Sequence, residues 1–138
     1  PLVIVDGRLN ARSYENLLER HLLPFYEGLN TDLPCLFQDD NAPCHRAHTV
    51  TSWKDDNMIN SLLWPAQSPD LNPIEHLWDV LERRVRARRP HPKNKGELII
   101  ALKEEWLNID QSILENLVDS MPRRIEAVIK SKGYPTKY

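Results

Sequence analysis

The pattern of apolar residues changes near residue 68, and this change limits the folds that the chain can adopt. Before it, short apolar runs such as residues 2–5 alternate with stretches of helical spacing. A short apolar run bounded by turn residues is typical of a buried strand. After residue 68 the apolar spacing is helical. The pattern therefore predicts an α/β portion followed by a helical portion.

The first portion is expected to contain three short strands and two helices between them. Ser13 is predicted to cap the first helix, which stops before Pro24 because proline disrupts a helix interior. Asp6-Gly7 reads as a turn that closes the first strand. The expected strands cover residues 2–5, 34–38 and 59–64, and the expected helices cover residues 14–22 and 45–56. This order of elements favours at least partly parallel pairing.

The second portion opens with a rigid proline-containing turn and continues as helices. Asn72 is predicted to cap a helix whose first residue is Pro73, a position that suits proline. That helix is amphipathic and breaks before Pro90; its apolar face comprises Ile74, Leu77, Trp78, Leu81 and Val85. Two or three more helices are expected, at about residues 96–107, 111–120 and 122–131.

Charge is distributed unevenly along the chain. Residues 1–81 carry 12 acidic and 5 basic side chains, whereas residues 82–138 carry 8 acidic and 13 basic ones. The densest basic cluster comprises Arg83, Arg84, Arg86, Arg88, Arg89, Lys93 and Lys95. Such a cluster suits contacts to DNA phosphates. For Arg83 and Arg84 the alternative is a solvated helix face that balances Glu82 and Asp79.

Two acidic residues stand where an α/β fold places its ligand crevice. Asp40 follows an apolar strand, and Glu75 lies in the first turn of an amphipathic helix, with 34 residues between them. Carboxylates gathered at such a place can hold hard cations such as Mg²⁺. Each acid also has a structural explanation: Glu75 completes a capping box with Asn72, and Asp40 suits a polar turn.

The segments around these acids resemble a known family. Residues 38–45, QDDNAPCH, and residues 64–78, WPAQSPDLNPIEHLW, are similar to the DDE transposases of the Tc/mariner superfamily, in particular its Tc-type, Sleeping Beauty-like branch. The likeness extends from residues 5–7 to the closing residues 133–138. On these motifs, the family's second and third catalytic carboxylates fall on Asp40 and Glu75, and supporting positions fall on Asn41 and His45.

The resemblance implies a partial ribonuclease-H-like α/β fold, with three strands and flanking helices, followed by a helical tail. It makes residues 1–138 a single partial catalytic domain, in which residues 1–89 form the ribonuclease-H-like portion and residues 90–138 the tail. The implied chemistry is DNA strand cleavage and strand transfer with Mg²⁺ or Mn²⁺, in the nucleus. The implied partners are transposon-end and target DNA, and further copies in a homodimer or larger assembly.

One departure from the family pattern bears on activity. The family's first catalytic Asp lies upstream of the segment that resembles residues 1–10, and Asp6 matches a turn residue that is no metal ligand. The expectation is that this chain alone is inactive and belongs to a longer protein. The alternative is a decayed or domesticated remnant that binds DNA or protein without catalysis.

Overall fold

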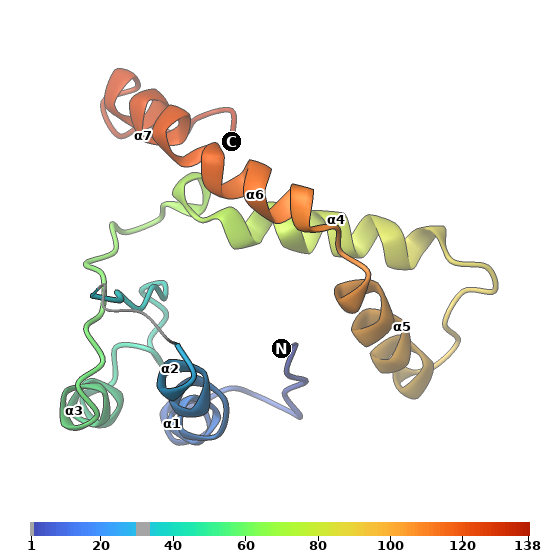
Figure 1. The fold of residues 1–138 in the computed structure, drawn as a ribbon, viewed down its shortest axis with the longest axis horizontal. Coiled ribbons are helices and arrows are strands. Elements are labelled where there is room, and N and C mark those ends of the chain that lie inside the picture. Colours follow the sequence, from blue (N-terminus) through green and yellow to red (C-terminus); the bar gives the residue numbers. More distant parts are fainter. Residues whose placement is uncertain (1, 30–33) are drawn as a thin grey trace. The chain divides into compact units, whose positions relative to one another are not determined.

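The computed structural model describes residues 2–29 and 34–138, which form two compact units (Figure 1). Unit 1 comprises residues 3–66, and unit 2 comprises residues 67–138 together with Leu2. Helices are the regular elements of both units. In the described ranges, no helix combines the length and the apolar character that a membrane crossing needs.

Unit 1 is built on two packed helical segments. Its elements are α1 (Ala11–Leu17), a π-helical turn η1 (Leu18–Leu22), α2 (Leu23–Glu27) and α3 (His48–Asp56). The first three form one continuous helical rod, and α1 lies beside α3 (Figure 1). Tyr14, Leu18 and Val50 make the buried centre of this contact.

The first helix departs from the prediction at both of its ends. Asn10, and not Ser13, is the N-cap: its side chain accepts from the Ser13 N–H, and the Ser13 hydroxyl accepts from the Asn10 N–H in return. The helix also continues past Pro24. Before that proline, the Leu23 N–H bonds to the Leu18 carbonyl in the wider π pattern. We infer that this widened turn accommodates the proline ring, which would clash in a regular helix interior.

The strand prediction is not confirmed among the described residues, where the structure has an isolated parallel bridge between Phe37 and Ser61. Two backbone hydrogen bonds accompany it, from the Phe37 N–H to Asn60 and from the Leu62 N–H to Phe37. Residues 2–5 lie in no strand, although Gly7 adopts the left-handed conformation expected of the turn. Side-chain exposure still alternates along residues 34–40, as in a strand. The expected helix at 45–56 begins later, at His48.

Unit 2 follows the predicted helical pattern closely. It contains η2 (Pro69–Leu71), α4 (Pro73–Ala87), α5 (Lys95–Leu107), α6 (Gln111–Asp119) and α7 (Met121–Lys130). The Asn72 side chain accepts from the Ile74 N–H, and Pro73 is the first residue of α4, as predicted. Asn94 and Asp110 cap α5 and α6 in the same manner.

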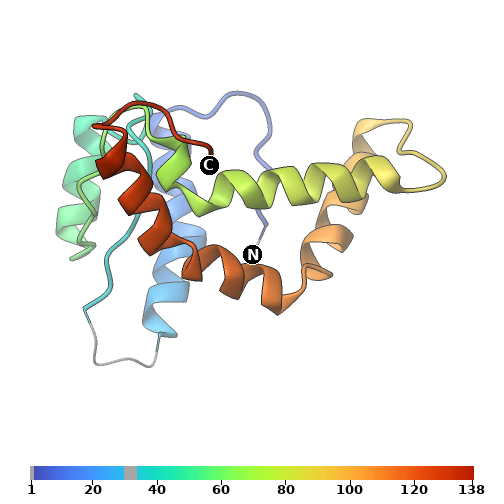
Figure 2. The same cartoon turned by 90° about the horizontal axis from the view of Figure 1, so that it is seen from above.

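The core of unit 2 lies between α4 and α5. Leu81, Val85 and Ala101 are buried there, and Trp106 packs against them. Figures 1 and 2 both show α5 turning back against the C-terminal half of α4. The predicted apolar face of α4 is confirmed for Leu77, Leu81 and Val85, which are buried, whereas Ile74 is half-buried and Trp78 is 40% exposed.

Helix α7 contacts η2 through a buried arginine. Arg124 is 2% exposed, and its Nη1 donates to the Asp70 carbonyl oxygen at 2.8 Å. Its Nε donates to the Ser120 hydroxyl at 2.7 Å, and its guanidinium lies over the Tyr138 ring. The turn that leads into α4 is thus tied to the last helix of the chain.

Candidate catalytic site

Asp40 presents an exposed carboxylate whose one oxygen is held in place. Its Oδ1 lies 2.7 Å from His45 Nδ1 and accepts from the Ala42 N–H at 2.9 Å. The Asp40 side chain is 56% exposed, whereas that of His45 is 17% exposed. In the part of the chain that the structure describes, Oδ2 has no hydrogen-bond partner. The group is therefore oriented and yet accessible to a ligand.

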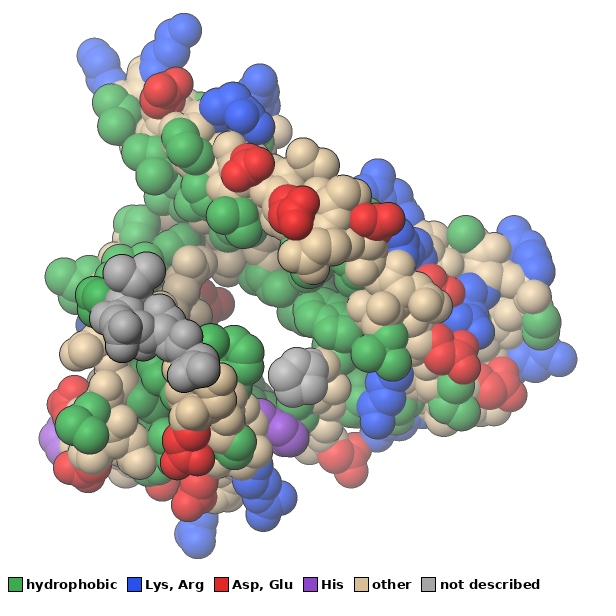
Figure 3. Space-filling view, viewed as in Figure 1, with side chains coloured by type: hydrophobic (Ala, Val, Ile, Leu, Met, Phe, Trp, Pro, Cys, Tyr) green, Lys and Arg blue, Asp and Glu red, His purple; other side chains and the backbone are tan. Residues whose placement is uncertain are grey.

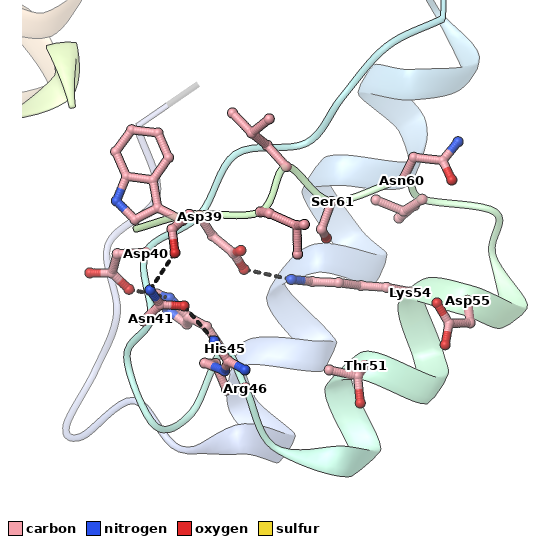
Figure 4. Close-up of a pocket in the computed structure, with 14 residues that line it drawn as sticks. Asp39, Asp40, Asn41, His45, Arg46, Thr51, Lys54, Asp55, Asn60 and Ser61 are labelled. Carbon is pink, nitrogen blue, oxygen red and sulfur yellow. Dashed lines mark hydrogen bonds and ion pairs between the residues drawn. The ribbon is translucent and has the colours of Figure 1, made fainter. Parts of the chain in front are cut away.

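Asn41 connects this segment to the neighbouring one. Its Nδ2 donates to the Trp64 carbonyl oxygen at 2.8 Å, and its Oδ1 accepts from Arg46 at 2.8 Å. Three of the four site residues expected from the sequence, Asp40, Asn41 and His45, are thus brought together within unit 1. Figure 4 shows them at one end of a pocket.

The pocket has a volume of about 340 Å³ and mixes polar and apolar walls. Asp40 and Asn41 contribute from one segment, Thr51 and Asp55 from α3, and residues 59–64 from the next segment. The pocket thus lies beside the bridged segments that follow the strand-like pattern, within a single unit. A crevice at this place is what the predicted carboxylate cluster requires.

A nearly buried charge pair in the wall of the pocket was not predicted from the sequence. Asp39 Oδ2 accepts from Lys54 Nζ at 2.6 Å, and both side chains are nearly enclosed, 12% and 6% exposed (Figure 4). The Tyr14 hydroxyl donates to the same oxygen at 2.9 Å. Two signals could have indicated it: alternation places Asp39 opposite to Asp40, and Lys54 stands one turn after buried Val50.

Tyr14 contacts both Asp39 and His45. Its ring stacks on the His45 ring, with centroids 4.0 Å apart and an angle of 29°. Burial of the phenol, and then the negative charge of Asp39, raise the pKa of Tyr14 far above its ordinary value. The hydroxyl therefore stays protonated at neutral pH and remains a donor to Asp39.

Glu75 lies in the other unit. It is exposed, in the first turn of α4, where a carboxylate is favoured by the helix dipole. Its N–H bonds to the Asn72 carbonyl, as the cap geometry requires. Asp40 belongs to unit 1 and Glu75 to unit 2, and their convergence on one ion stays a prediction.

The arginines of the basic cluster differ in how far they are already engaged. Arg88 bridges Glu104 at 2.6 Å and Glu105 at 2.8 Å, and these hydrogen bonds raise its pKa. Arg84 donates to the Asn108 carbonyl at 2.6 Å, and Arg86 pairs with Glu82. Figure 3 shows basic and acidic side chains interspersed over this end of unit 2.

Arg83, Arg89 and Lys93 form no ion pair with a carboxylate among the described residues. Arg83 uses its Nε for the Asp79 carbonyl, and Arg89 uses one Nη for the carbonyls of Arg86 and Arg88 and for His91. Within residues 2–29 and 34–138, the Lys93 ammonium has no ion pair or hydrogen bond. Among the described residues, Arg86 pairs with Glu82, whereas Arg83 and Arg84 donate to the Asp79 and Asn108 carbonyls and to neither carboxylate of the proposed solvated face.

The donor chemistry suits a hard divalent cation at Asp40, because an accessible carboxylate oxygen is the ligand that Mg²⁺ prefers. The described residues contain no group of three His, Cys, Asp or Glu side chains placed to hold a metal. Among the described residues, Cys35 and Cys44 form no disulfide and belong to no such group.

Comparison with known proteins supports the family resemblance. Residues 1–99 match the family described as DDE superfamily endonuclease. The chain is 41% identical over its full length to the Tcb1 transposase of Caenorhabditis briggsae and, likewise, to the Tc1 transposase of Caenorhabditis elegans. It is 34% identical over 134 residues to the Tc3 transposase of C. elegans. The chain spans 50% of the length of the first two relatives and 40% of the third.

Solved structures show a similar fold. The catalytic domain of Mos1 mariner transposase, determined with raltegravir and Mn, is 22% identical, with a TM-score of 0.77. The match covers 95% of this chain and 67% of that domain. The corresponding structure with Mg gives the same values. The family match over residues 1–99 establishes that the chain belongs to the DDE superfamily of endonucleases, and the relatives that it resembles are Tc-type transposases.

Proposed function

We propose that this chain supplies two of the three metal-binding carboxylates of a transposase that cleaves transposon ends and joins them to target DNA. The match to the DDE endonuclease family over residues 1–99 carries the proposal, because that range includes both Asp40 and Glu75. The Mos1 catalytic domain has been solved with Mn and with Mg, which supports the use of such ions here. The predicted ribonuclease-H-like strands, at residues 2–5, 34–38 and 59–64, belong to this proposal.

Asp40 and Glu75 would be the metal ligands in this proposal, with Mg²⁺ or Mn²⁺ as the ion. When bound, such ions activate the attacking oxygen and stabilise the leaving oxygen of a phosphodiester. His45 and the Ala42 N–H hold Oδ1 of Asp40, so that Oδ2 is left to face a ligand. Asn41 keeps the Asp40 loop fixed to the Trp64 carbonyl.

Metal titration of the 138-residue chain tests this assignment. Mn²⁺ should broaden the NMR signals of residues near Asp40 and Glu75, and Asp40→Asn and Glu75→Gln should each weaken binding about tenfold or more, the usual cost of disturbing a metal's protein shell. Asp79→Asn, an exposed acid one turn further along α4, is the matched control and should bind as the unchanged chain does. Equal affinity in all four proteins would exclude the metal-ligand roles and favour a non-catalytic remnant.

Catalysis is expected to need more than these two carboxylates. Two divalent ions require bridging ligands, and two carboxylates seldom provide enough of them. The 138-residue chain, given Mn²⁺ and transposon-end DNA, should therefore leave the strands uncut. Strand cleavage by this chain alone would contradict that expectation.

We also propose that the basic cluster contacts the DNA backbone, with Arg83, Arg89 and Lys93 as its main contacts. These side chains keep donors that are not committed to carboxylates. Arg86 and Arg88 are assigned a smaller share because carboxylates already pair with their guanidiniums, and Arg84 because it donates to the Asn108 carbonyl at the end of α5. Lys95 stays in the predicted interface.

Salt-dependent DNA binding separates these two sets. Each phosphate that the protein no longer neutralises should reduce the slope of log affinity against log salt by about 0.9. Changing Arg83, Arg89 and Lys93 together to Ala should therefore flatten the slope by nearly three. Changing Arg84, Arg86 and Arg88 together is the matched control and should flatten it by less. A larger effect in the control would reverse the assignment.

The remaining features of the proposal concern the whole protein. It would act in the nucleus on transposon and target DNA, as a homodimer or larger assembly. Residues 1–138 would be one partial catalytic domain, with residues 1–89 ribonuclease-H-like and residues 90–138 a helical tail. Sedimentation of the protein with transposon-end DNA measures the assembly state directly, and a monomeric complex would remove the oligomer from the proposal.

A further inference from the structure

A series of side-chain contacts connects the buried Lys54 to the exposed Asp40. Lys54 Nζ bonds to Asp39 Oδ2, and the Tyr14 hydroxyl donates to the same oxygen. Tyr14 then stacks on His45, which contacts Asp40. These contacts thus link α3, through a residue of α1, to the exposed carboxylate.

Stability alone is a poor explanation for the Lys54–Asp39 pair. Burying two charges removes them from water, and the attraction between them often does no more than offset that cost. Apolar residues of similar size at both positions would serve a core equally well. Buried ionic groups of this kind can instead fix one arrangement of their neighbours, and this arrangement includes Tyr14.

Tyr14 is placed so that its fixed ring can restrict the orientation of His45 in the pocket. The phenol is 6% exposed and its hydroxyl is fixed by Asp39, so its ring has one defined plane. The imidazole of His45 lies against that plane at 4.0 Å between centroids. A ring held on one face has few alternative rotamers, and its Nδ1 stays 2.7 Å from Asp40 Oδ1.

We propose that Tyr14 is a positioning residue for Asp40. The Lys54–Asp39 pair fixes the phenol, the phenol fixes the His45 ring, and the ring fixes Oδ1 of Asp40 while Oδ2 remains available. The catalytic meaning of this arrangement rests on the proposed function. The arrangement itself does not, and it can be tested without metal or DNA.

The experiment uses NMR of the 138-residue chain at one fixed pH. NOEs from the His45 ring to the Tyr14 ring and to the Asp40 β-protons report the stack and the contact. Tyr14→Leu keeps an apolar side chain and removes the ring, and we expect the His45–Asp40 NOEs to fall at least threefold. Tyr14→Phe keeps the ring and should retain most of their intensity. Tyr26→Leu, a tyrosine of α2 in the same unit, is the control and should leave them unchanged.

A structural role for Tyr14 makes a different prediction. In that case Tyr14→Leu lowers the stability of α1 and α3, but the His45–Asp40 NOEs of the folded protein keep their intensity. That result overturns the proposal. Should Tyr14→Leu fail to fold, the double change Lys54→Met with Asp39→Asn tests the same series of contacts, because it removes the charge pair that holds Tyr14. Weakened His45–Asp40 NOEs in the double variant support positioning, and unchanged ones overturn it.

A second arm separates this proposal from the proposed function. Mn²⁺ affinity should fall several-fold in Tyr14→Leu if Asp40 is a ligand that needs fixing. If the unchanged chain and Asp40→Asn bind Mn²⁺ equally, the metal assignment fails. The His45–Asp40 NOEs then still decide whether Tyr14 positions Asp40.

Discussion

Two ion pairs of this molecule have the same length and opposite surroundings. In unit 1, Lys54 and Asp39 approach to 2.6 Å with side chains only 6% and 12% exposed. In unit 2, Arg86 and Glu82 also approach to 2.6 Å, but their side chains are 76% and 57% exposed. The distance between the charged atoms therefore does not predict which pair matters more for stability. Burial does, because the loss of one buried partner leaves the other charge without water or a counterion.

The two units use charge for different purposes as a result. Unit 1 encloses its pair in the wall of the pocket, where it can hold Tyr14 and His45 in one arrangement. Unit 2 spreads its pairs over an exposed helix end, where solvent screens them and a phosphate can compete for them. Four predictions test this contrast, beginning with the largest expected effect.

Lys54→Met should give the largest loss of stability. It leaves the Asp39 carboxylate buried without its cation, and breaking such a pair costs about 3–5 kcal/mol. Hydrogen exchange of the α1 and α3 amides measures the loss within unit 1. Lys103→Met, an exposed lysine of α5, is the control and should change little. If both variants lose the same stability, the loss in Lys54→Met does not come from the buried pair.

Arg124→Met tests a buried charge in unit 2. The change removes the donors to the Asp70 carbonyl and the Ser120 hydroxyl and should cost about 2–3 kcal/mol, the usual range for hydrogen bonds to a charged group. Denaturant unfolding followed by Trp78 and Trp106 fluorescence measures it. Arg123→Met, the exposed neighbour on α7, is the matched control. A loss below that of the control would show that the η2 contact is dispensable.

Asp110 provides a pH-dependent test. Its carboxylate accepts from the Ser112 N–H and hydroxyl, and these bonds lower its pKa below the ordinary value. Because the folded pKa is depressed, its stabilising effect is complete above the unfolded value near about 3.9 and is lost as pH falls through the folded pKa. The protection of the α6 amides, corrected for their intrinsic exchange rates, should therefore fall below about pH 4. Asp110→Asn should reduce this dependence, and an unaltered pH profile would contradict the assignment.

Arg86→Ala should give the smallest effect. Exposed pairs at this helical spacing contribute about 0.3–0.5 kcal/mol, and salt screens them. Thermal unfolding at low and high salt measures the change, which should shrink as salt rises. A loss comparable to that of Lys54→Met would break the comparison between the two pairs.

Local signals predicted unit 2 well and unit 1 less well. The helices from α4 to α7 follow from apolar spacing and from caps such as Asn72 and Pro73, which act within one turn. In unit 1 the same kind of signal failed at Pro24, because a π-helical turn carries the helix past that proline. The strands remained a prediction, because a ladder needs paired neighbours that a local pattern does not specify.

The candidate site divides in the same way. Asp40, Asn41 and His45 could be selected from the sequence, since a short motif carries them and the structure brings them together. Asp39, Lys54 and Tyr14 could not be selected, because the nearest two of them are 15 residues apart. Alternating exposure along residues 34–40 was the one local sign of Asp39's role.

The sequence by itself determined the family, the helices of unit 2 and the residues that offer carboxylates. These depend on motifs and on periodicities of about two or 3.6 residues, which are local properties of a chain. Only the tertiary structure decided that Lys54 neutralises Asp39 and that Arg124 holds Asp70, 54 residues away in the chain. The physical reason is that burial turns an ordinary charge into one that requires a specific partner, and burial arises only when the helices pack.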